Sequence, residues 1–465
     1  MINLSLEFTE KNLNEIYTIT SGLSKSSEEF GFGFPFLSFK TIFYNYYINE
    51  DLDELVNSTE EEQKKHSVKK GDVFLTRTSE TLDELGMSCV ALRDYPNATF
   101  NGFTKRLRPK KDNVIYPLYA CYYFRSTLFR KYVDSMAIMT TRASLNNNIL
   151  SRLPIIFPNY EDQKKIGYLL HNLDKKIELN KEINNHLENL LMSIFNSWFI
   201  NFEVYNKSNG MKFDESFGDV PRLWSVEMLE DYVDFVTGVE PGSKNYHEKP
   251  EINDIPFIRV GDLGSRTNAV FIDKSLSKNK ILSFDDIVLS LDATVGIVKM
   301  GLKGAYSTGM RKLLIKNDDI NKPFLYCLVK SKRIQRIIET FATGTTILHA
   351  GKSIKHMNFV LSDKQTMNQF GKIGNPILSI ILANLKEIEK LTNMRDMLLP
   401  KLMSGEINVS EINYDLKRII RKFILSLLNY LYENKNYFKN TKSNETLLKS
   451  RTIHKIDKYF TKFIR

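Results

Sequence analysis

The feature that most constrains this chain is an internal repeat with a period of roughly 200 residues. Four short motifs occur twice in the same order, at 68–76 and 282–290, 101–105 and 308–312, 119–122 and 325–328, and 153–156 and 357–360. The offset between the copies falls from 214 through 207 to 204, as expected when loops of related domains differ in length. The sequence therefore predicts two similar domains.

Each copy ends in a long helical pattern whose apolar residues recur at intervals of three and four, which is a heptad seam. The first helix is expected over 163–199, with Asn159 as its cap, and would be roughly 55 Å long. The second is expected to begin near Pro376, because Gly371 and Gly374 interrupt the pattern before it. It should end near Ser404 and Gly405, after Pro400.

The two seams are expected to pair with each other. The pairing residues are Ile166, Leu170, Leu173, Ile177, Asn180, Leu187 and Leu191 in the first helix, and Ile377, Ile381, Asn384, Ile388, Leu391 and Leu398 in the second. Asn180 corresponds to Asn384 at the offset of 204, and a buried Asn–Asn contact can fix register. A lone helix would more simply pack on its own domain, but two related seams with one shared polar position favour an antiparallel pair.

Composition excludes several classes of protein. The 465 residues are 42% hydrophobic and 12% aromatic, which excludes global disorder. There is neither an apolar run long enough to span a membrane nor a signal-peptide pattern at the start, so we expect neither a membrane span nor a signal peptide. Cys89, Cys121 and Cys327 are scattered and form no disulfide framework, so we expect a protein of the reducing cytoplasm. The net charge of +10 suggests an anionic partner, with nucleic acid the first candidate.

Further motifs give residues 1–410 a resemblance to the specificity subunit of type I restriction-modification systems. The most specific motifs lie at the start of the first long helix and the end of the second, at 161–178 and 398–407. The others lie in the second copy, at 220–224, 255–263 and 291–311, and the first of these contains Pro-x-x-Trp. The recognition domains of this family match mainly in pattern, as expected for units that read different DNA sequences.

The resemblance implies an α/β (α+β) fold, with two similar target-recognition domains joined by two long antiparallel spacer helices in a pseudo-twofold repeat. It implies a non-catalytic subunit, in which each domain reads half of a bipartite, asymmetric site in double-stranded DNA. The helices would set the spacing and dock two copies of a methyltransferase subunit, and restriction motor-nuclease subunits would join the complex. The methyl donor and ATP are expected on those partners, with no cofactor on this chain.

The expected boundaries follow from the repeat and the helical patterns. They are 1–158 for the first target-recognition domain, 159–204 for the first spacer helix, 205–223 for a linker, 224–361 for the second target-recognition domain, 362–407 for the second spacer helix and 408–465 for a basic C-terminal extension. The linker is polar and shows no period. A helix of roughly 55 Å is long enough to bridge successive major grooves, which lie ~34–36 Å apart on one side of B-DNA.

The alternative is a stand-alone DNA-modifying or DNA-cleaving enzyme. The sequence lacks an Asn-Pro-Pro-aromatic motif and a glycine-rich turn for a methyl-donor nucleotide. Residues 346–353 end in Gly-Lys-Ser like a P-loop, but Thr346 stands where the first glycine is required. The histidines and cysteines show no metal-ligand spacing. These absences favour the non-catalytic interpretation.

Candidate DNA contacts are basic and amide residues on corresponding loops and strands of the two copies. They are Lys105, Arg106, Arg108, Lys110, Lys111, Arg142, Asn146 and Asn147 in the first copy, and Arg311, Lys312, Thr345, Thr346 and Lys352 in the second. Arg and Asn suit guanine and adenine edges, and Lys suits phosphate. The alternative is that they are solvated surface charges. Alternate side chains of a strand face opposite ways, so Lys105, Arg106 and Arg108 cannot all reach DNA.

Most of the net charge lies at the end of the chain. Residues 415–465 contain 13 Lys and Arg against 4 Asp and Glu, whereas residues 1–414 have a net charge of only +1. A helical apolar pattern covers 416–432, and the remainder is rich in Asn and Lys. This tail departs from the family pattern, and its sequence fits a DNA-binding or partner-binding extension as well as an appended segment without function.

Overall fold

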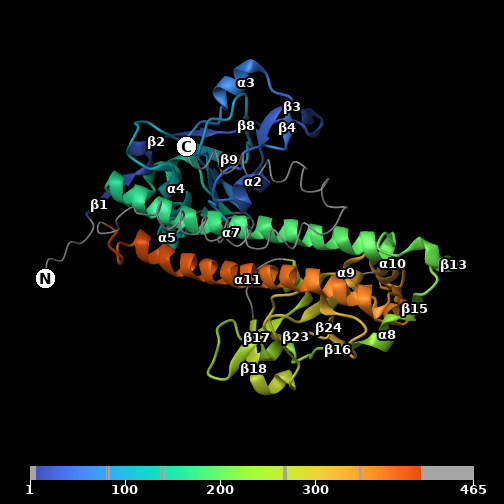
Figure 1. Ribbon diagram of the computed structural model, residues 1–465. Coiled ribbons are helices and arrows are strands. Elements are labelled where there is room, and N and C mark those ends of the chain that lie inside the picture. The colour runs from blue at the N-terminus through green and yellow to red at the C-terminus, as the bar shows by residue number, and fades with distance from the viewer. Residues whose placement is uncertain are drawn as a thin grey trace.

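The computed structural model describes residues 7–79, 81, 84–136, 138–139, 143–264, 270–344 and 348–409. Two similar α/β domains lie near opposite ends of a pair of long helices, and on opposite sides of it (Figure 1). The helices are α7, Tyr160–Phe195, and α11, Lys364–Met403. At ~1.5 Å per residue they are roughly 54 and 60 Å long. This confirms the expected architecture. No described helix is long and apolar enough to cross a membrane.

The first domain is built on an antiparallel central sheet and a mixed outer sheet beside short helices. Its central sheet has the order β2 (Tyr17–Ser21), β9 (Thr104–Pro109), β5 (Val73–Thr76) and β7 (Ser88–Val90). The outer sheet has the order β4 (Leu55–Val56), β3 (Phe30–Leu37) and β8 (Thr99–Phe100). Smaller ladders join β1 (Phe8–Asn12) to β12 (Pro154–Pro158), and β10 (Ile138–Met139) and β6 (Thr78–Ser79) to β11 (Ala143–Ser144). The helices are α1 (Leu13–Ile16), α2 (Phe39–Tyr44), α3 (Glu60–Lys65), α4 (Pro117–Tyr123), α5 (Thr127–Met136) and α6 (Asn147–Arg152).

The second domain repeats this plan. Its central sheet has the order β16 (Val233–Thr237), β24 (Met310–Ile315), β20 (Ile287–Ser290) and β22 (Val298–Lys299). The outer sheet has the order β18 (Val270–Asp273), β17 (Asp254–Ile258), β23 (Gly304–Tyr306) and β19 (Ile281–Leu282). Ladders join β15 (Ser225–Met228) to β26 (Asn358–Leu361), and β21 (Asp292–Ala293) to β25 (Leu348–His349). The helices are α8 (Leu229–Tyr232), α9 (Lys322–Lys330) and α10 (Lys332–Thr340).

The strand register of the two domains is the same. Val73 pairs with Leu107 in the first domain, and Ile287 pairs with Leu313 in the second. The offset is therefore 214 on one strand and 206 on its neighbour. The match of 101–105 to 308–312, at an offset of 207, was wrong by one residue. The loops before β9 and β24 have the same length, but their glycines, Gly102 and Gly309, stand at neighbouring positions of the loop.

The second long helix begins at Lys364, so the expected start near Pro376 was wrong. Asp363 caps it by accepting a hydrogen bond of 2.8 Å from the Thr366 N–H. The glycines serve close packing: a Cβ on Gly374 would lie 2.4 Å from Cβ of Pro323 on α9. Pro376 lacks an N–H, but the helix continues through it because apolar residues on both sides are buried in the second domain.

The two helices pair in antiparallel fashion through a polar centre. Asn384 Nδ2 donates to Asn184 Oδ1 at 2.8 Å, and Asn180 Nδ2 donates to Glu387 Oε2 at 2.8 Å. The Asn–Asn contact therefore exists, but it joins Asn384 to Asn184 and not to its repeat equivalent Asn180. Farther along, the guanidinium of Arg395 lies 2.7 Å from the buried carboxylate of Asp174, which explains a charged residue in the seam.

The ends of each seam extend into the hydrophobic cores of the two domains. Ile166 and Leu170 are buried in the core of the first domain, and Leu398 packs against that core. Leu191, Ile377 and Ile381 are buried in the core of the second domain, and Leu187 packs against it. Ile177 and Ile388 are buried nearer the middle, and Leu173 and Leu391 are half-buried. Each domain is thus completed by both helices, so the domains and the helix pair form one framework.

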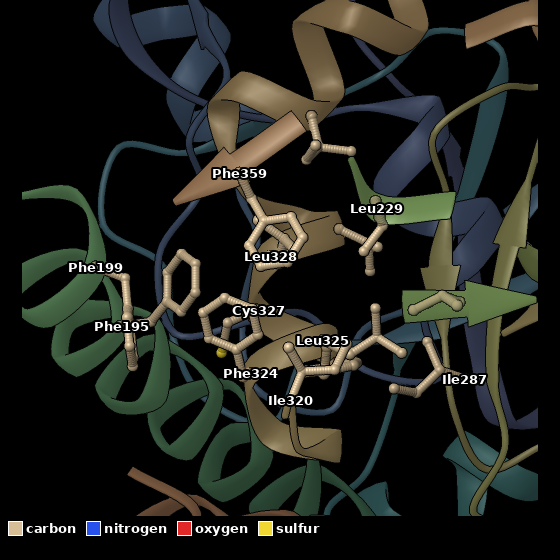
Figure 2. Close-up of a cluster of buried hydrophobic side chains, with 14 of the residues drawn as sticks. Phe195, Phe199, Leu229, Ile287, Ile320, Phe324, Leu325, Cys327, Leu328 and Phe359 are labelled. Carbon is tan, nitrogen blue, oxygen red and sulfur yellow. The ribbon is translucent and has the colours of Figure 1, made fainter. Parts of the chain in front are cut away.

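Aromatic residues at the end of α7 and in the π-helical turn Asn196–Ile200 that follows it anchor the second domain. Figure 2 shows Phe195 and Phe199 beside Phe324 of α9. The ring centroids lie 5.5 Å apart for Phe195 and Phe324, and 4.9 Å for Phe199 and Phe324. Trp224 is 2% exposed in the same core and donates from Nε1 to Asp363 Oδ2 at 3.1 Å. This bond ties the start of the second domain to the start of α11.

The segment 205–223 is more ordered than its polar sequence predicts. It contains a hairpin of β13, Met211–Asp214, and β14, Gly218–Pro221. The Asp214 carboxylate accepts from the N–H groups of Ser216 and Phe217, and Gly218 has φ +74°, which together form the turn. Val220 is fully buried in the core of the second domain. The interpretation of this segment as a plain linker was therefore wrong.

Candidate nucleic-acid interface

Two of the candidate cations on β9 point into the first domain. Lys105 and Arg106 are each 5% exposed. Lys105 Nζ donates to Ser21 Oγ at 2.7 Å, and Arg106 Nη1 donates to the Ser67 carbonyl at 2.6 Å. Burial lowers the pKa of both groups, to about 10 for Arg106. Lys105 and Arg106 are therefore not part of the candidate interface, because their charged groups are buried and hydrogen-bonded inside the domain.

A second pair of candidate cations binds equivalent carboxylates. Arg108 Nε and Nη2 donate to the two oxygens of Asp72 at 2.7 and 2.6 Å. In the second domain Lys312 Nζ lies 2.6 Å from Asp286 Oδ2. Asp72 and Asp286 also accept backbone N–H groups of the turns before β5 and β20. Arg108 and Lys312 therefore brace a turn onto the central sheet in both domains.

Three loops converge in each domain at the end of the central sheet where β9 or β24 begins. We call these sets the three-loop clusters, formed by 76–79, 101–104 and 143–146 in the first domain and by 290–293, 307–310 and 348–351 in the second. One residue joins the loops in each. Arg77 bonds through its backbone to Phe103 and Leu145, and Leu291 bonds in the same way to Gly309 and Ala350. The clusters are equivalent in backbone structure.

Each cluster lies at the start of a central strand whose other end leads toward the helix pair. β9 begins at the first cluster and ends at Pro109, after which the Tyr116 N–H donates to Gln163 Oε1 of α7 at 2.8 Å. β24 begins at the second cluster, and the chain after it reaches α11 where Asn321 Nδ2 donates to the Met367 carbonyl at 2.7 Å. Each cluster thus lies at the opposite end of a central strand from the helices that position it.

The two clusters present different chemistry at equivalent positions. Thr78 pairs with Ser144 across the ladder of the first domain, whereas Asp292 pairs with His349 in the second. His349 Nδ1 lies 2.8 Å from Asp292 Oδ1, and the His349 side chain is 63% exposed. The Asp292 carboxylate favours the tautomer with hydrogen on Nδ1, which leaves Nε2 as an acceptor. An imidazole held in this way can contact a base edge or a phosphate group.

Other candidates lie on or next to the clusters. Asn146 caps α6 by accepting from the Ile149 N–H at 2.9 Å, and it and Asn147 are exposed. Lys352 is exposed beside the second cluster. Arg311 is half-buried and donates to the Thr308 and Met310 carbonyls, and burial lowers its pKa while Asp292 opposes the shift.

The remaining candidates lie elsewhere. Lys110 and Lys111 are exposed at the far end of β9, where Lys110 Nζ donates to the Asn14 carbonyl. Arg142, Thr345 and Thr346 lie outside the described residues. The structure therefore brings together Asn146 and Asn147 on one cluster, and Arg311 and Lys352 on the other, and it separates Lys110 and Lys111 from both.

The Asp292–His349 pair was missed by the sequence argument. In sequence the two residues lie 57 positions apart, and neither has a local pattern that points to the other. The repeat contains the information needed to find this pair, because the loop that contains Asn146 corresponds to the loop that contains Lys352. In the two ladders, Ser144 corresponds to His349 at an offset of 205 and Thr78 to Asp292 at an offset of 214, so the repeat places the two pairs at equivalent positions.

Among the described residues, the clusters offer neither a group of metal ligands nor a reactive thiol. Among them, no three His, Cys, Asp or Glu side chains gather as a metal site. All three cysteines are buried, and burial raises the pKa of each thiol, to about 12 for Cys89. Such thiols stay protonated at neutral pH and are poor nucleophiles. What the clusters can supply is hydrogen bonding and charge.

Known proteins resemble this chain over most of its length. The family model described as "Type I restriction modification DNA specificity domain" matches residues 6–189 and 221–390. The type I restriction enzyme MjaIX specificity subunit of Methanocaldococcus jannaschii is 28% identical over 86% of this chain and 93% of its own. The HindI specificity subunit of Haemophilus influenzae is 24% identical over 74% and 88%. The crystal structure of the type I S subunit from M. genitalium superposes with a TM-score of 0.53 at 16% identity, covering 86% of this chain and 97% of that one.

Proposed function

Because the chain belongs to the type I restriction-modification DNA specificity family, we propose that it is the subunit that selects the DNA sequence for such a complex. Each domain reads one half of a bipartite site in double-stranded DNA. The helix pair fixes the distance and orientation between the halves. Methyl transfer and cleavage take place on partner subunits, to which the methyl donor and ATP bind.

The observation that carries this proposal is the contrast between the two three-loop clusters. Their backbones are equivalent, yet Thr78 and Ser144 stand in one where Asp292 and His349 stand in the other. Hydroxyl groups, a carboxylate and an imidazole recognise different base edges. Two clusters with equivalent backbones and different side chains would recognise two different half-sites. The complete DNA site would therefore be asymmetric.

The helix pair supports the proposed spacing role. Polar contacts at its centre, such as Asn184 with Asn384, specify one register, and both ends are buried in the domain cores. A pair fixed in this way changes length little, so the clusters keep a constant separation. The approximate twofold relation of the two halves offers two similar surfaces, which suits two copies of a methyltransferase subunit. Restriction motor-nuclease subunits would join that assembly.

Reconstitution of methyl transfer tests the proposal. The purified chain and the methyltransferase subunit of the same host are incubated, singly and together, with a DNA library and a labelled methyl donor. We expect sequence-specific methylation only when both proteins are present. Methylation or cleavage by this chain alone would show the stand-alone enzyme instead, and unchanged specificity of the methyltransferase with and without the chain would contradict the selecting role.

A further inference from the structure

An exposed aromatic strip lies on the first domain, on β3, at the part of the domain far from the helix pair (Figure 1). Phe30, Phe32 and Phe34 are 37, 51 and 40% exposed, and we call them the phenylalanine strip. The intervening Gly31 and Gly33 have φ of +94° and +95°, a region that favours glycine. A Cβ on Gly33 would lie only 2.6 Å from the Val56 carbonyl oxygen, so glycine is needed for the strip to lie against β4. The function proposed above does not use these residues.

Acidic side chains border the strip. Residues 50–62 contain seven Asp and Glu and no Lys or Arg. Backbone bonds of 2.8 Å from Phe36 to Glu54 and from Asn57 to Glu29 hold this segment beside β3. Its carboxylates at Asp53, Glu54, Glu60 and Glu61 are exposed, and we call these four the acidic rim. Lys64 lies 4.0 Å from Glu60, but the four carboxylates of the rim exceed it in charge. The face therefore repels phosphate and suits a ligand that is both basic and apolar.

The end of this same chain has that chemistry. Residues 415–465 carry 13 Lys and Arg against 4 Asp and Glu, and they include apolar runs and the aromatic pairs at 437–438 and 459–460. The described chain ends at Val409, which is buried in the core of the first domain. The 56 residues that follow can extend by up to roughly 3.3 Å each, far more than one domain requires. The segment therefore starts on the domain that carries the strip and is long enough to reach it.

We propose that residues 410–465 dock on the phenylalanine strip and the acidic rim of the same chain. The aromatic and aliphatic side chains of the segment cover the three phenylalanines, and its lysines and arginines lie against the four carboxylates. Because both surfaces belong to one chain, the local concentration of the segment is high and modest contacts suffice. This docking accounts for the position of the excess positive charge in a chain whose body is close to neutral.

Carbodiimide cross-linking of the purified full-length chain tests the contact directly, because the reagent joins a carboxylate to a lysine amine without a spacer. Light and isotopically heavy chains are mixed at low concentration before reaction. We expect peptides that join lysines of 410–465 to the acidic rim within one isotopic form. Links only between light and heavy chains would assign the strip to a second copy, and absence of links from the segment to the rim would show that the segment does not dock there. Either result overturns the proposal.

A proteolysis series gives an independent test. In the variant F32S/F34S/D53N/E54Q, whose changes lie at exposed positions, trypsin should cleave the segment about tenfold faster, since cleavage follows the undocked population. The matched control is F213S/E215Q on the β13–β14 hairpin, where Phe213 is 76% exposed. It should leave the cleavage rate unchanged. Equal rates in wild type and the strip variant would contradict docking.

Discussion

Asn384 Nδ2 donates a hydrogen bond of 2.8 Å to Asn184 Oδ1, in the middle of the two long helices. Asn184 Nδ2 in turn donates to the Ile381 carbonyl at 3.2 Å. Asn180 bonds instead to Glu387, and its own Oδ1 is buried with no hydrogen-bond partner in the described chain. Sliding one helix by a turn would break these contacts and leave several buried amides without partners, so they specify the register.

A double-mutant cycle should detect this contact. We expect N184A and N384A to show a coupling free energy of about 1 kcal/mol, the usual net value of one hydrogen bond. The measurement is urea unfolding of the wild type, both single variants and the double variant. N180A with N384A is the matched control and should be nearly additive, because those residues are not bonded to each other. Additivity of the first pair would contradict the register described here.

Gly374→Ala should destabilise the protein. Alanine in a helix interior is normally favoured over glycine by about 1 kcal/mol. Here the added methyl would lie 2.4 Å from Cβ of Pro323, and overpacking of this kind costs about 1–3 kcal/mol. Urea unfolding should therefore show a net loss of stability. The exposed residue Ser379 provides the control, since S379A should be neutral or slightly stabilising. A stabilised Gly374 variant would contradict the close approach of α9 and α11.

Asp363 should contribute stability that disappears in acid. Burial raises its pKa, but hydrogen bonds from Thr366 and Trp224 outweigh that effect, and the net pKa lies below the ordinary value. A lowered folded pKa means that the contribution is complete above about pH 4, where the unfolded carboxyl is ionised, and is lost as pH falls through the folded pKa. The unfolding free energy of wild type minus D363N should be constant from neutral to mildly acid pH and shrink below about pH 4. A difference that stays constant into acid, or grows, would contradict this role.

His349→Ala should alter recognition in one half-site alone. Loss of the imidazole removes a side chain that the Asp292 carboxylate holds at the surface of the second cluster. If it contacts a base, one position of that half-site becomes degenerate, with discrimination reduced by about 1–3 kcal/mol. Methylation of a DNA library by the variant with its methyltransferase measures this. S144A, at the equivalent position of the first domain, should affect only the other half-site. A change in both halves for either variant would contradict independent reading.

The repeat made the domain plan and the antiparallel helices predictable, because strand turns and heptad spacing are local signals. The glycines of α11 depend on contacts that are distant in sequence, so local signals do not predict their role. In sequence, Gly371 and Gly374 interrupt a helical pattern, and only the neighbouring Asn321 and Pro323 reveal that they permit close packing. The register of the helix pair is also not a local property. Asn180 corresponds to Asn384 in the repeat, but Asn184 is the residue that contacts Asn384, because packing of both helices against the domain cores sets their relative position.

Surface chemistry was harder to predict than architecture. Lys105 and Arg106 are basic residues on a strand near the expected interface, and nothing local distinguishes them from DNA contacts. Their partners, Ser21 and Ser67, come from distant parts of the chain, so internal bonding of these cations becomes visible only in the folded structure. The same distance in sequence concealed the Asp292–His349 pair, whose members are brought together by a short ladder between two loops.

Methylome sequencing tests the central claim most directly. Cells that carry the cognate methyltransferase subunit are sequenced with and without the gene for this chain. The account predicts that methylation appears at one split motif only when both genes are present, with two different half-sites separated by a constant number of unspecified base pairs. A continuous motif, identical halves, a variable gap, or methylation that does not depend on this chain would contradict it.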